Sequence, residues 1–249
     1  MGGSGVRQLN DFAREEVSGQ YVNSPARLLP GVGEDDSLWE DLLPDFHGPV
    51  QLQPADGSSI KERARRVVEA LSAPTLLVGH SMGGLIALRA AEIAPEACLC
   101  VVLISTGHPV EVNPKIYAAL ESDPPAAVAF LAAAAAGGKP GALDERQEEI
   151  AERFARMARN RRPAELARDL RACEEFTPIP DPGRLAVPIV SVWGTTDRMI
   201  RPAAMQGLAR RLGASEMPLE GVGHQIPWEL PRAVIDACLS CGPSAEGTG

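Results

Sequence analysis

Residues 75–84 read TLLVGHSMGG, and this stretch decides the fold. An apolar run of the kind buried in a parallel sheet ends at Val78, and an alanine-rich helix begins a few residues later. Ser81 lies at the apex of the turn between them. Such a turn strains the serine backbone, and strand and helix pass closely only where the residues two before and two after are nearly free of side chain. Gly79 and Gly83 meet that requirement, so the stretch predicts a nucleophile elbow that exposes a serine hydroxyl.

The bulk composition permits a full core and argues against two classes of partner. The chain has 249 residues, 45% of them hydrophobic, which suits one large α/β domain or two small ones. Its net charge of −9 argues against non-specific binding of nucleic acid, which needs a cationic surface. Residues 1–25 contain no apolar run long enough for a signal peptide, and no later stretch approaches a membrane span of about 20 apolar residues. We therefore expect a cytoplasmic protein that binds neither nucleic acid nor membrane.

Cysteines are scattered along the chain, at Cys98, Cys100, Cys173, Cys238 and Cys241. The last two have the spacing of a metal or redox pair. However, no second pair stands at zinc-ligand spacing, and no βαβ unit follows so close to the terminus. We expect buried, reduced thiols, no metal and no cofactor.

Strands and helices alternate on both sides of the Ser81 turn. Besides the strand and helix around that turn, we expect strands over residues 27–29, 47–54, 99–105, 188–193 and 215–219, and helices over residues 38–43, 60–71, 202–212 and 227–239. Strict alternation predicts an α/β fold, with a mostly parallel, doubly wound sheet and helices on both faces. Residues 1–25 give only hints of strand, so whether they complete the sheet stays open.

The alternation breaks for about 75 residues after position 108. Four helices are predicted there, over residues 114–121, 124–136, 143–159 and 163–175, with Pro- and Gly-rich breaks between them. A helical insertion between core strands is most naturally a lid over the sheet's carboxyl edge, and a separate docking module is the alternative. We therefore divide the chain into an α/β core, residues 1–107 and 183–249, and a helical lid, residues 108–182.

Three side chains of complementary chemistry follow directly on predicted strands: Ser81, Asp197 and His224. The carboxyl ends of parallel strands meet at one edge of the sheet, which is where such folds place ligands. A serine hydroxyl is a poor nucleophile at neutral pH, so it needs a base within hydrogen-bond reach and an acid behind that base. The order Ser, Asp, His differs from the orders in trypsin and subtilisin. An ordinary turn aspartate and a surface loop histidine are the alternative interpretations of Asp197 and His224.

The remaining polar candidates have weaker patterns. We expect His80 to point away along the turn and to pack against the next strand, and His47 to face solvent. His108 stands at the entrance of the predicted lid and is a candidate substrate contact. Glu111 is a reserve candidate for the acid.

Four segments, taken in chain order, resemble the α/β-hydrolase superfamily, particularly its small lidded carboxylesterases and lactonases. They are Leu29-Pro30-Gly31, residues 79–84 (GHSMGG), residues 193–197 (WGTTD) and residues 221–224 (GVGH), and the resemblance covers residues 26 to about 240. It implies Ser81 as nucleophile, His224 as general base and acid, and Asp197 as orienting acid.

The resemblance also implies an oxyanion hole made by the backbone N–H groups of Val32 and Met82. Family members usually carry His-Gly where this chain has Pro30-Gly31. That departure leaves the role of Val32 intact, because the role belongs to a backbone group, but it removes a side chain that often braces the loop.

By the same resemblance we expect a serine hydrolase that cleaves a small carboxylic ester or lactone through an acyl-enzyme on Ser81. C–C bond hydrolysis, lyase chemistry and acyl transfer with the same triad stay open, as does a non-catalytic receptor for a small ligand. Dehalogenase and epoxide hydrolase chemistry is disfavoured, since those relatives place Asp where Ser81 stands. The apolar lid suggests an apolar acyl or alkyl group. Four lid arginines either recruit a carboxylate or form a solvated helix face: Arg161, Arg162, Arg168 and Arg171.

Overall fold

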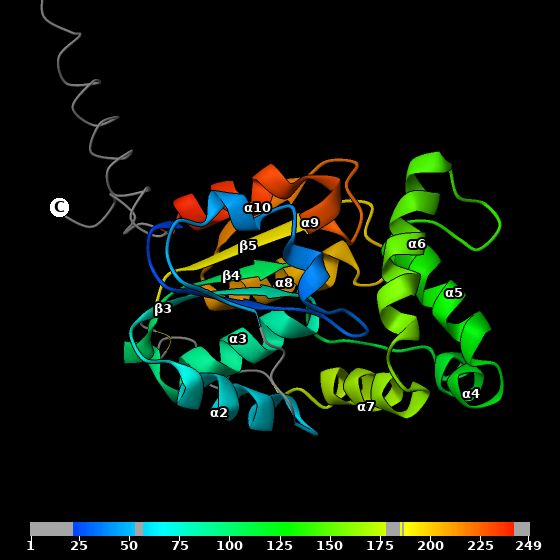
Figure 1. Ribbon diagram of the computed structural model, residues 1–249, viewed down its shortest axis with the longest axis horizontal. Coiled ribbons are helices and arrows are strands. Elements are labelled where there is room, and N and C mark those ends of the chain that lie inside the picture. The colour runs from blue at the N-terminus through cyan, green and yellow to red at the C-terminus, as the bar shows by residue number, and fades with distance from the viewer. Residues whose placement is uncertain (1–21, 53–56, 178–184, 186, 242–249) are drawn as a thin grey trace, which may run out of the picture.

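The computed structural model of the protein describes residues 22–52, 57–177, 185 and 187–241. Within them, six strands form one sheet in the order β2-β1-β3-β4-β5-β6 (Figure 1). The strands are β1 (Ala26–Leu29), β2 (Val50–Gln51), β3 (Thr75–His80), β4 (Cys98–Ile104), β5 (Ile189–Gly194) and β6 (Ser215–Leu219). Each neighbouring pair is parallel, which confirms the predicted α/β fold.

Helices cover both faces of the sheet, as predicted. They are α2 (Ile60–Ala70), α3 (Met82–Ile93), α8 (Pro202–Leu212), α9 (Ile226–Glu229) and α10 (Pro231–Leu239), with short 3-10 helices η1 (Asp36–Trp39), η2 (Leu43–Asp45) and η3 (Pro95–Ala97). Successive strand residues point to opposite faces. Leu77 and Leu103 therefore pack in the layer that contains α2 and α3, whereas Val78 and Val102 pack in the layer that contains α10. Figure 1 shows these helices on opposite sides of the sheet.

Two predicted helices are interrupted. Residues 38 and 39 end η1, residues 40–42 form a turn and residue 43 begins η2, so no single helix covers residues 38–43. Glu40 and Leu42 donate to carbonyls three residues back, which is the 3-10 pattern. The helix predicted over residues 227–239 is divided into α9 and α10, because Pro231 disfavours helical backbone at Leu230, whose φ is −151° and ψ 67°.

The sheet is less extensive at its edge than the sequence suggests. Of the strand predicted over residues 47–54, only β2 pairs with β1, and residues 53–56 lie outside the described residues. The strand hints before residue 22 and the tail after residue 241 also lie outside them.

Four helices between β4 and β5 form the helical insertion: α4 (Pro114–Ser122), α5 (Pro124–Ala135), α6 (Glu145–Arg159) and α7 (Pro163–Glu174). Each boundary lies within two residues of its prediction. Figure 1 shows the insertion grouped beyond one end of the sheet. The predicted lid boundary at residue 182 lies outside the described residues and stays a prediction. Neither these nor other helices of the described chain are long and apolar enough to span a membrane.

A disulfide joins Cys100 of β4 to Cys241, so the expectation of reduced thiols is wrong for this pair. The other three cysteines are free and buried, as expected. Burial raises the pKa of Cys238 to about 12, which keeps that thiol protonated at neutral pH. Among the described residues, no three His, Cys, Asp or Glu side chains gather as a metal site would require.

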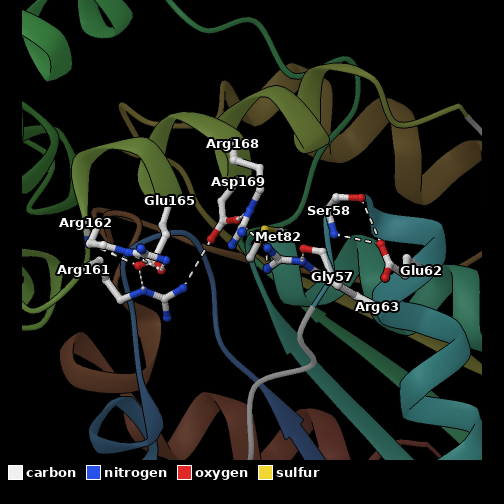
Figure 2. A network of polar contacts seen from close by, with 10 residues as sticks. All are labelled: Gly57, Ser58, Glu62, Arg63, Met82, Arg161, Arg162, Glu165, Arg168 and Asp169. Atoms are coloured by element: carbon white, nitrogen blue, oxygen red, sulfur yellow. Dashed lines mark hydrogen bonds and ion pairs between the residues drawn. The ribbon is translucent and has the colours of Figure 1, made fainter.

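A buried ion pair joins the helical insertion to the core. Arg63 of α2 pairs with Asp169 of α7, and both side chains are buried (Figure 2). The Arg63 guanidinium also donates to the carbonyl of Gly57 at 3.0 Å and lies 3.7 Å from Sδ of Met82, the first residue of α3. One side chain therefore contacts the insertion and the start of the helix that follows Ser81.

Replacing Asp169 with asparagine should lower the free energy of unfolding by about 3–5 kcal/mol, because the Arg63 charge would stay buried without its counter-ion. The double variant Arg63→Met, Asp169→Leu removes both charges and should lose less. Urea unfolding of the three proteins measures both differences.

The matched control is Asp236→Asn, which removes a carboxylate from an exposed pair with Arg232. Exposed pairs contribute about 0–1 kcal/mol. An Asp169→Asn variant no less stable than this control would contradict the anchoring role.

Candidate active site

Ser81 occupies the predicted turn between β3 and α3. Its φ of 53° and ψ of −116° are strained for a residue with a side chain. The Ser81 N–H donates to the carbonyl of Ile104 on β4 at 2.8 Å, which fastens the turn to the neighbouring strand. The side chain is thereby presented at the carboxyl end of β3.

Glycines at two positions allow this turn. A Cβ at Gly83 would lie 1.9 Å from the carbonyl oxygen of Leu29, at the end of β1. A Cβ at Gly79 would lie 2.4 Å from the backbone of Gly83. Both distances are far below van der Waals contact, so the requirement for glycine predicted from the sequence is confirmed.

His224 and Asp197 form a buried pair. Nδ1 of His224 lies 2.7 Å from Oδ2 of Asp197, and the other carboxylate oxygen accepts the N–H groups of Met199 at 2.8 Å and Ile200 at 2.9 Å. Since a carboxylate accepts, Nδ1 carries the proton and Nε2 is left as a basic nitrogen. The three acceptor contacts fix the Asp197 carboxylate, which in turn fixes the imidazole ring.

Ser81 and His224 line one cavity of about 260 Å³. Each inserted helix contributes an apolar side chain to its wall: Ile116, Leu131, Phe154 and Leu170. The insertion therefore lies over the carboxyl edge of the sheet. Asp197 does not line the cavity and is buried behind His224. Within the described residues, no hydrogen bond reaches the Ser81 hydroxyl or Nε2 of His224.

Val32 and Met82 also line this cavity. In the part of the chain that the structure describes, their backbone N–H groups donate to no protein acceptor. The Met82 N–H is the first of α3, where the positive end of the helix dipole favours negative charge. Two N–H groups are thus available to a negatively charged oxygen in the cavity.

A profile described as the Alpha/beta hydrolase family matches residues 26–237. The chain belongs to the alpha/beta hydrolase family. The match contains Ser81, Asp197 and His224, and it confirms the resemblance seen in the four sequence segments. The search of curated proteins returned no significant match.

Solved structures of several hydrolases share the fold of this alpha/beta hydrolase. A thermophilic esterase is 24% identical with a TM-score of 0.70, over 85% of this chain and 86% of its own. The enol-lactonase from Burkholderia xenovorans LB400 is 20% identical with a TM-score of 0.72, over 86% and 89%. The 2-hydroxy-6-oxo-6-phenylhexa-2,4-dienoate hydrolase from Rhodococcus sp. strain RHA1 is 20% identical with a TM-score of 0.63, over 85% and 88%. At these identities the likeness concerns the fold.

A buried polar network surrounds Glu34, and no pattern in the sequence predicts it. His80 does not merely pack against a strand, because Nδ1 lies 2.8 Å from Oε2 of Glu34 and Nε2 lies 2.9 Å from the carbonyl of His224. Glu34 also accepts the N–H of Gly31 at 2.6 Å and Nε2 of Gln225 at 2.8 Å. The nearest signal in the sequence is an acid directly after a glycine loop, which gives no indication of burial.

Burial and neighbouring charges act in opposite directions on this network. Burial alone raises the pKa of Glu34, but the charge of His80 and hydrogen bonds from His80 and Gln225 outweigh it and lower that pKa below its usual value. Burial alone lowers the pKa of His80, but the charge of Glu34 and hydrogen bonds to Glu34 and the His224 carbonyl raise it above its usual value. Each group therefore favours the charged form of the other.

The other polar candidates lie elsewhere. His108 does not line the cavity, and its Nε2 lies 3.2 Å from the carbonyl of Phe176. Glu111 lines the cavity but pairs at 2.5 Å with Arg201 on the exposed surface. His47 is exposed, as predicted.

The four candidate arginines of the insertion, Arg161, Arg162, Arg168 and Arg171, are engaged outside the cavity. Arg161 and Arg168 lie near Asp169, Arg162 pairs with Glu165 at 2.7 Å, and Arg171 lies over the ring of Tyr117 (Figure 2 shows the first three). Among the described residues, the arginine that lines the cavity is Arg198, in the loop after β5. Of the two interpretations of these four, recruitment of a carboxylate in the cavity is therefore disfavoured.

Gly83→Ala should destabilise the protein by about 1–3 kcal/mol, because the new methyl group must push α3 away from the end of β1. Gly207→Ala is the matched control, since a Cβ at this position of α8 meets open space. Alanine there should stabilise the helix by about 0.5–1 kcal/mol. Thermal unfolding separates the two variants, and equal shifts would contradict the close approach at Gly83.

The Glu34–His80 pair makes stability depend on pH. The pKa of His80 is raised on folding. Its contribution to the free energy of unfolding is therefore complete below the unfolded-state pKa of about 6.5 and is lost as pH rises through the folded-state pKa. Because the pKa of Glu34 is lowered, its contribution is complete above about 4.3 and is lost as pH falls through the folded-state value. The pair should therefore stabilise most between about pH 4.5 and 6.5.

The free energy of unfolding of the wild type and of the double variant Glu34→Gln, His80→Asn should be measured from about pH 4 to about pH 9, a range that spans the ordinary pKa values of Glu and His. The quantity of interest is the difference between the two proteins at each pH. Groups remote from the pair contribute equally to both proteins and cancel in this difference. A difference that does not change with pH would rule out the ion pair.

Proposed function

We propose that this alpha/beta hydrolase is a serine esterase that cleaves a small carboxylic ester or lactone. Ser81 is the nucleophile, His224 the general base and acid, and Asp197 the orienting acid. The observation that carries the proposal is that Ser81 and the Asp197-bound His224 line one cavity. The two free N–H groups in the same cavity add support.

In the first half of the reaction, the substrate carbonyl lies above Ser81 with its oxygen toward the N–H groups of Val32 and Met82. Nε2 of His224 takes the hydroxyl proton while Oγ of Ser81 attacks the carbonyl carbon. The oxygen becomes an anion, and each donor aimed at it contributes about 3 kcal/mol to transition-state stabilisation. His224 then gives its proton to the departing alkoxide, which leaves the acyl group on Ser81.

In the second half, water takes the place of the alcohol. His224 removes one proton from the water while the water oxygen attacks the acyl carbon. The N–H groups of Val32 and Met82 stabilise the resulting anion again. Collapse of this intermediate returns the proton from His224 to Oγ of Ser81 and releases the carboxylic acid. Asp197 stays ionised throughout and stabilises the imidazolium that forms twice.

The cavity favours a compact, mainly apolar acyl group. Its volume of about 260 Å³ and its walls of Leu, Ile, Phe and Val side chains suit apolar carbon chains of modest length. We assign the lid role to the helical insertion, within residues 108–182, and the core role to residues 1–107 and 183–249. Such a lid excludes bulk water, which strengthens the electrostatic interactions at Ser81.

Incubation with a fluorophosphonate should add one phosphonyl group to Ser81, with loss of fluoride. Ser81→Ala should prevent the adduct, and Ser81→Ala or His224→Ala should lower kcat by about 10⁴-fold or more. Ser122→Ala, on an exposed face of α4, is the control and should label like the wild type. Mass spectrometry of the digested protein locates the group.

Turnover of nitrophenyl esters completes this test. Hydrolysis of short acyl chains supports the esterase function. Labelling of Ser81 without turnover of any ester would favour C–C bond chemistry or acyl transfer with the same triad. Folded protein that neither labels nor hydrolyses would exclude the catalytic function and favour a receptor.

A further inference from the structure

We propose that Glu34 is a positioning residue that joins the three loops of the site through one buried carboxylate. The inference rests on the proposed function, because it assigns a purpose to a group that the mechanism above does not use. Glu34 is 2% exposed and follows the glycine loop after β1. It also borders the cavity.

The contacts of this carboxylate connect segments far apart in the chain. Oε2 accepts the N–H of Gly31 at 2.6 Å and contacts Nδ1 of His80 at 2.8 Å, while Oε1 accepts Nε2 of Gln225 at 2.8 Å. Each partner is the chain neighbour of a residue assigned to the reaction: Gly31 precedes Val32, His80 precedes Ser81, and Gln225 follows His224. A single group therefore sets the spacing between the oxyanion loop, the nucleophile turn and the histidine loop.

His80 extends this connection to the backbone of His224. Its Nε2 donates to the His224 carbonyl at 2.9 Å, and the hydroxyl of Ser105 donates to the same oxygen at 2.8 Å. The two histidine rings lie 4.8 Å apart between centroids. His224 is thus held from two sides, by Asp197 at its ring and by His80 at its backbone.

Counting donors and acceptors assigns the protons. The His224 carbonyl can only accept, so Nε2 of His80 carries a proton. Glu34 receives donors from Gly31 and Gln225 at its two oxygens, and, despite burial, its pKa beside His80 is lowered while the pKa of His80 is raised. We therefore assign a proton to Nδ1 of His80 as well, which makes His80 an imidazolium with both N–H groups paired.

Glutamine at position 34 isolates the effect of the charge. Its amide can keep the contacts to Gly31 and Gln225, because the Gln225 amide can reverse and its Oε1 has no partner in the described structure. The substitution removes the negative charge opposite His80. The His80 ring then loses one of its two N–H protons and, with it, its contact either to residue 34 or to the His224 carbonyl. A residue needed only for packing would tolerate this isosteric change.

Two readouts test the proposal. In Glu34→Gln, kcat on the best nitrophenyl ester should fall about 10–100-fold while KM changes less than about threefold, since the catalytic groups shift but the cavity wall does not. In ¹⁵N NMR, both ring nitrogens of His80 should be protonated at neutral pH in the wild type, and one should lose its proton in the variant. Glu62→Gln, which removes an exposed carboxylate bound to Ser58, is the control and should keep kcat.

An unchanged kcat in Glu34→Gln, or a neutral His80 in the wild type, would overturn the proposal. Should Glu34→Gln fail to fold, Gln225→Met removes one of the three donors and carries the same test, with lower kcat at unchanged KM expected. Absence of labelling and turnover in the wild type would instead contradict the proposed function, and the NMR measurement would still decide the state of the Glu34–His80 pair.

Discussion

The close approach of α3 to the end of β1 is the constraint on which the site depends. Gly83 stands so near the carbonyl of Leu29 that no side chain fits between them. This contact places the Ser81 turn against the loop that continues from Leu29, and that loop contains Val32. The distance between the serine hydroxyl and one N–H donor thus follows from backbone packing, which is harder to deform than a side-chain contact.

A network of buried polar side chains lies at the carboxyl edge of the sheet. Asp197, His224, His80 and Glu34 are all buried, and their contacts pair each charge with hydrogen bonds. A low dielectric strengthens each of these interactions and makes an unpaired group costly, so the network selects one arrangement of the loops. The Arg63–Asp169 pair has a comparable effect outside the site, where it fastens the helical insertion to the start of α3.

Local patterns predicted most of the fold, whereas contacts between distant residues were not visible in the sequence. Glycine spacing revealed the Ser81 turn, and Pro and Gly breaks placed the inserted helices within two residues. The Glu34 network joins positions 46 and 191 residues apart, and the disulfide joins positions 141 apart. Burial of a particular glutamate or cysteine depends on tertiary packing, which periodicity does not encode. For the same reason His80 was interpreted as a packing residue.

The most direct measurement of the central claim is a crystal structure of the protein with a phosphonate bound to Ser81. The account predicts Nε2 of His224 within about 3.2 Å of Oγ of Ser81. It also predicts the phosphonyl oxygen within about 3.1 Å of the N–H groups of Val32 and Met82. An imidazole ring that stays beyond hydrogen-bond reach of Oγ, or an oxygen that faces neither N–H group, would contradict the convergence of the three loops on one reacting centre.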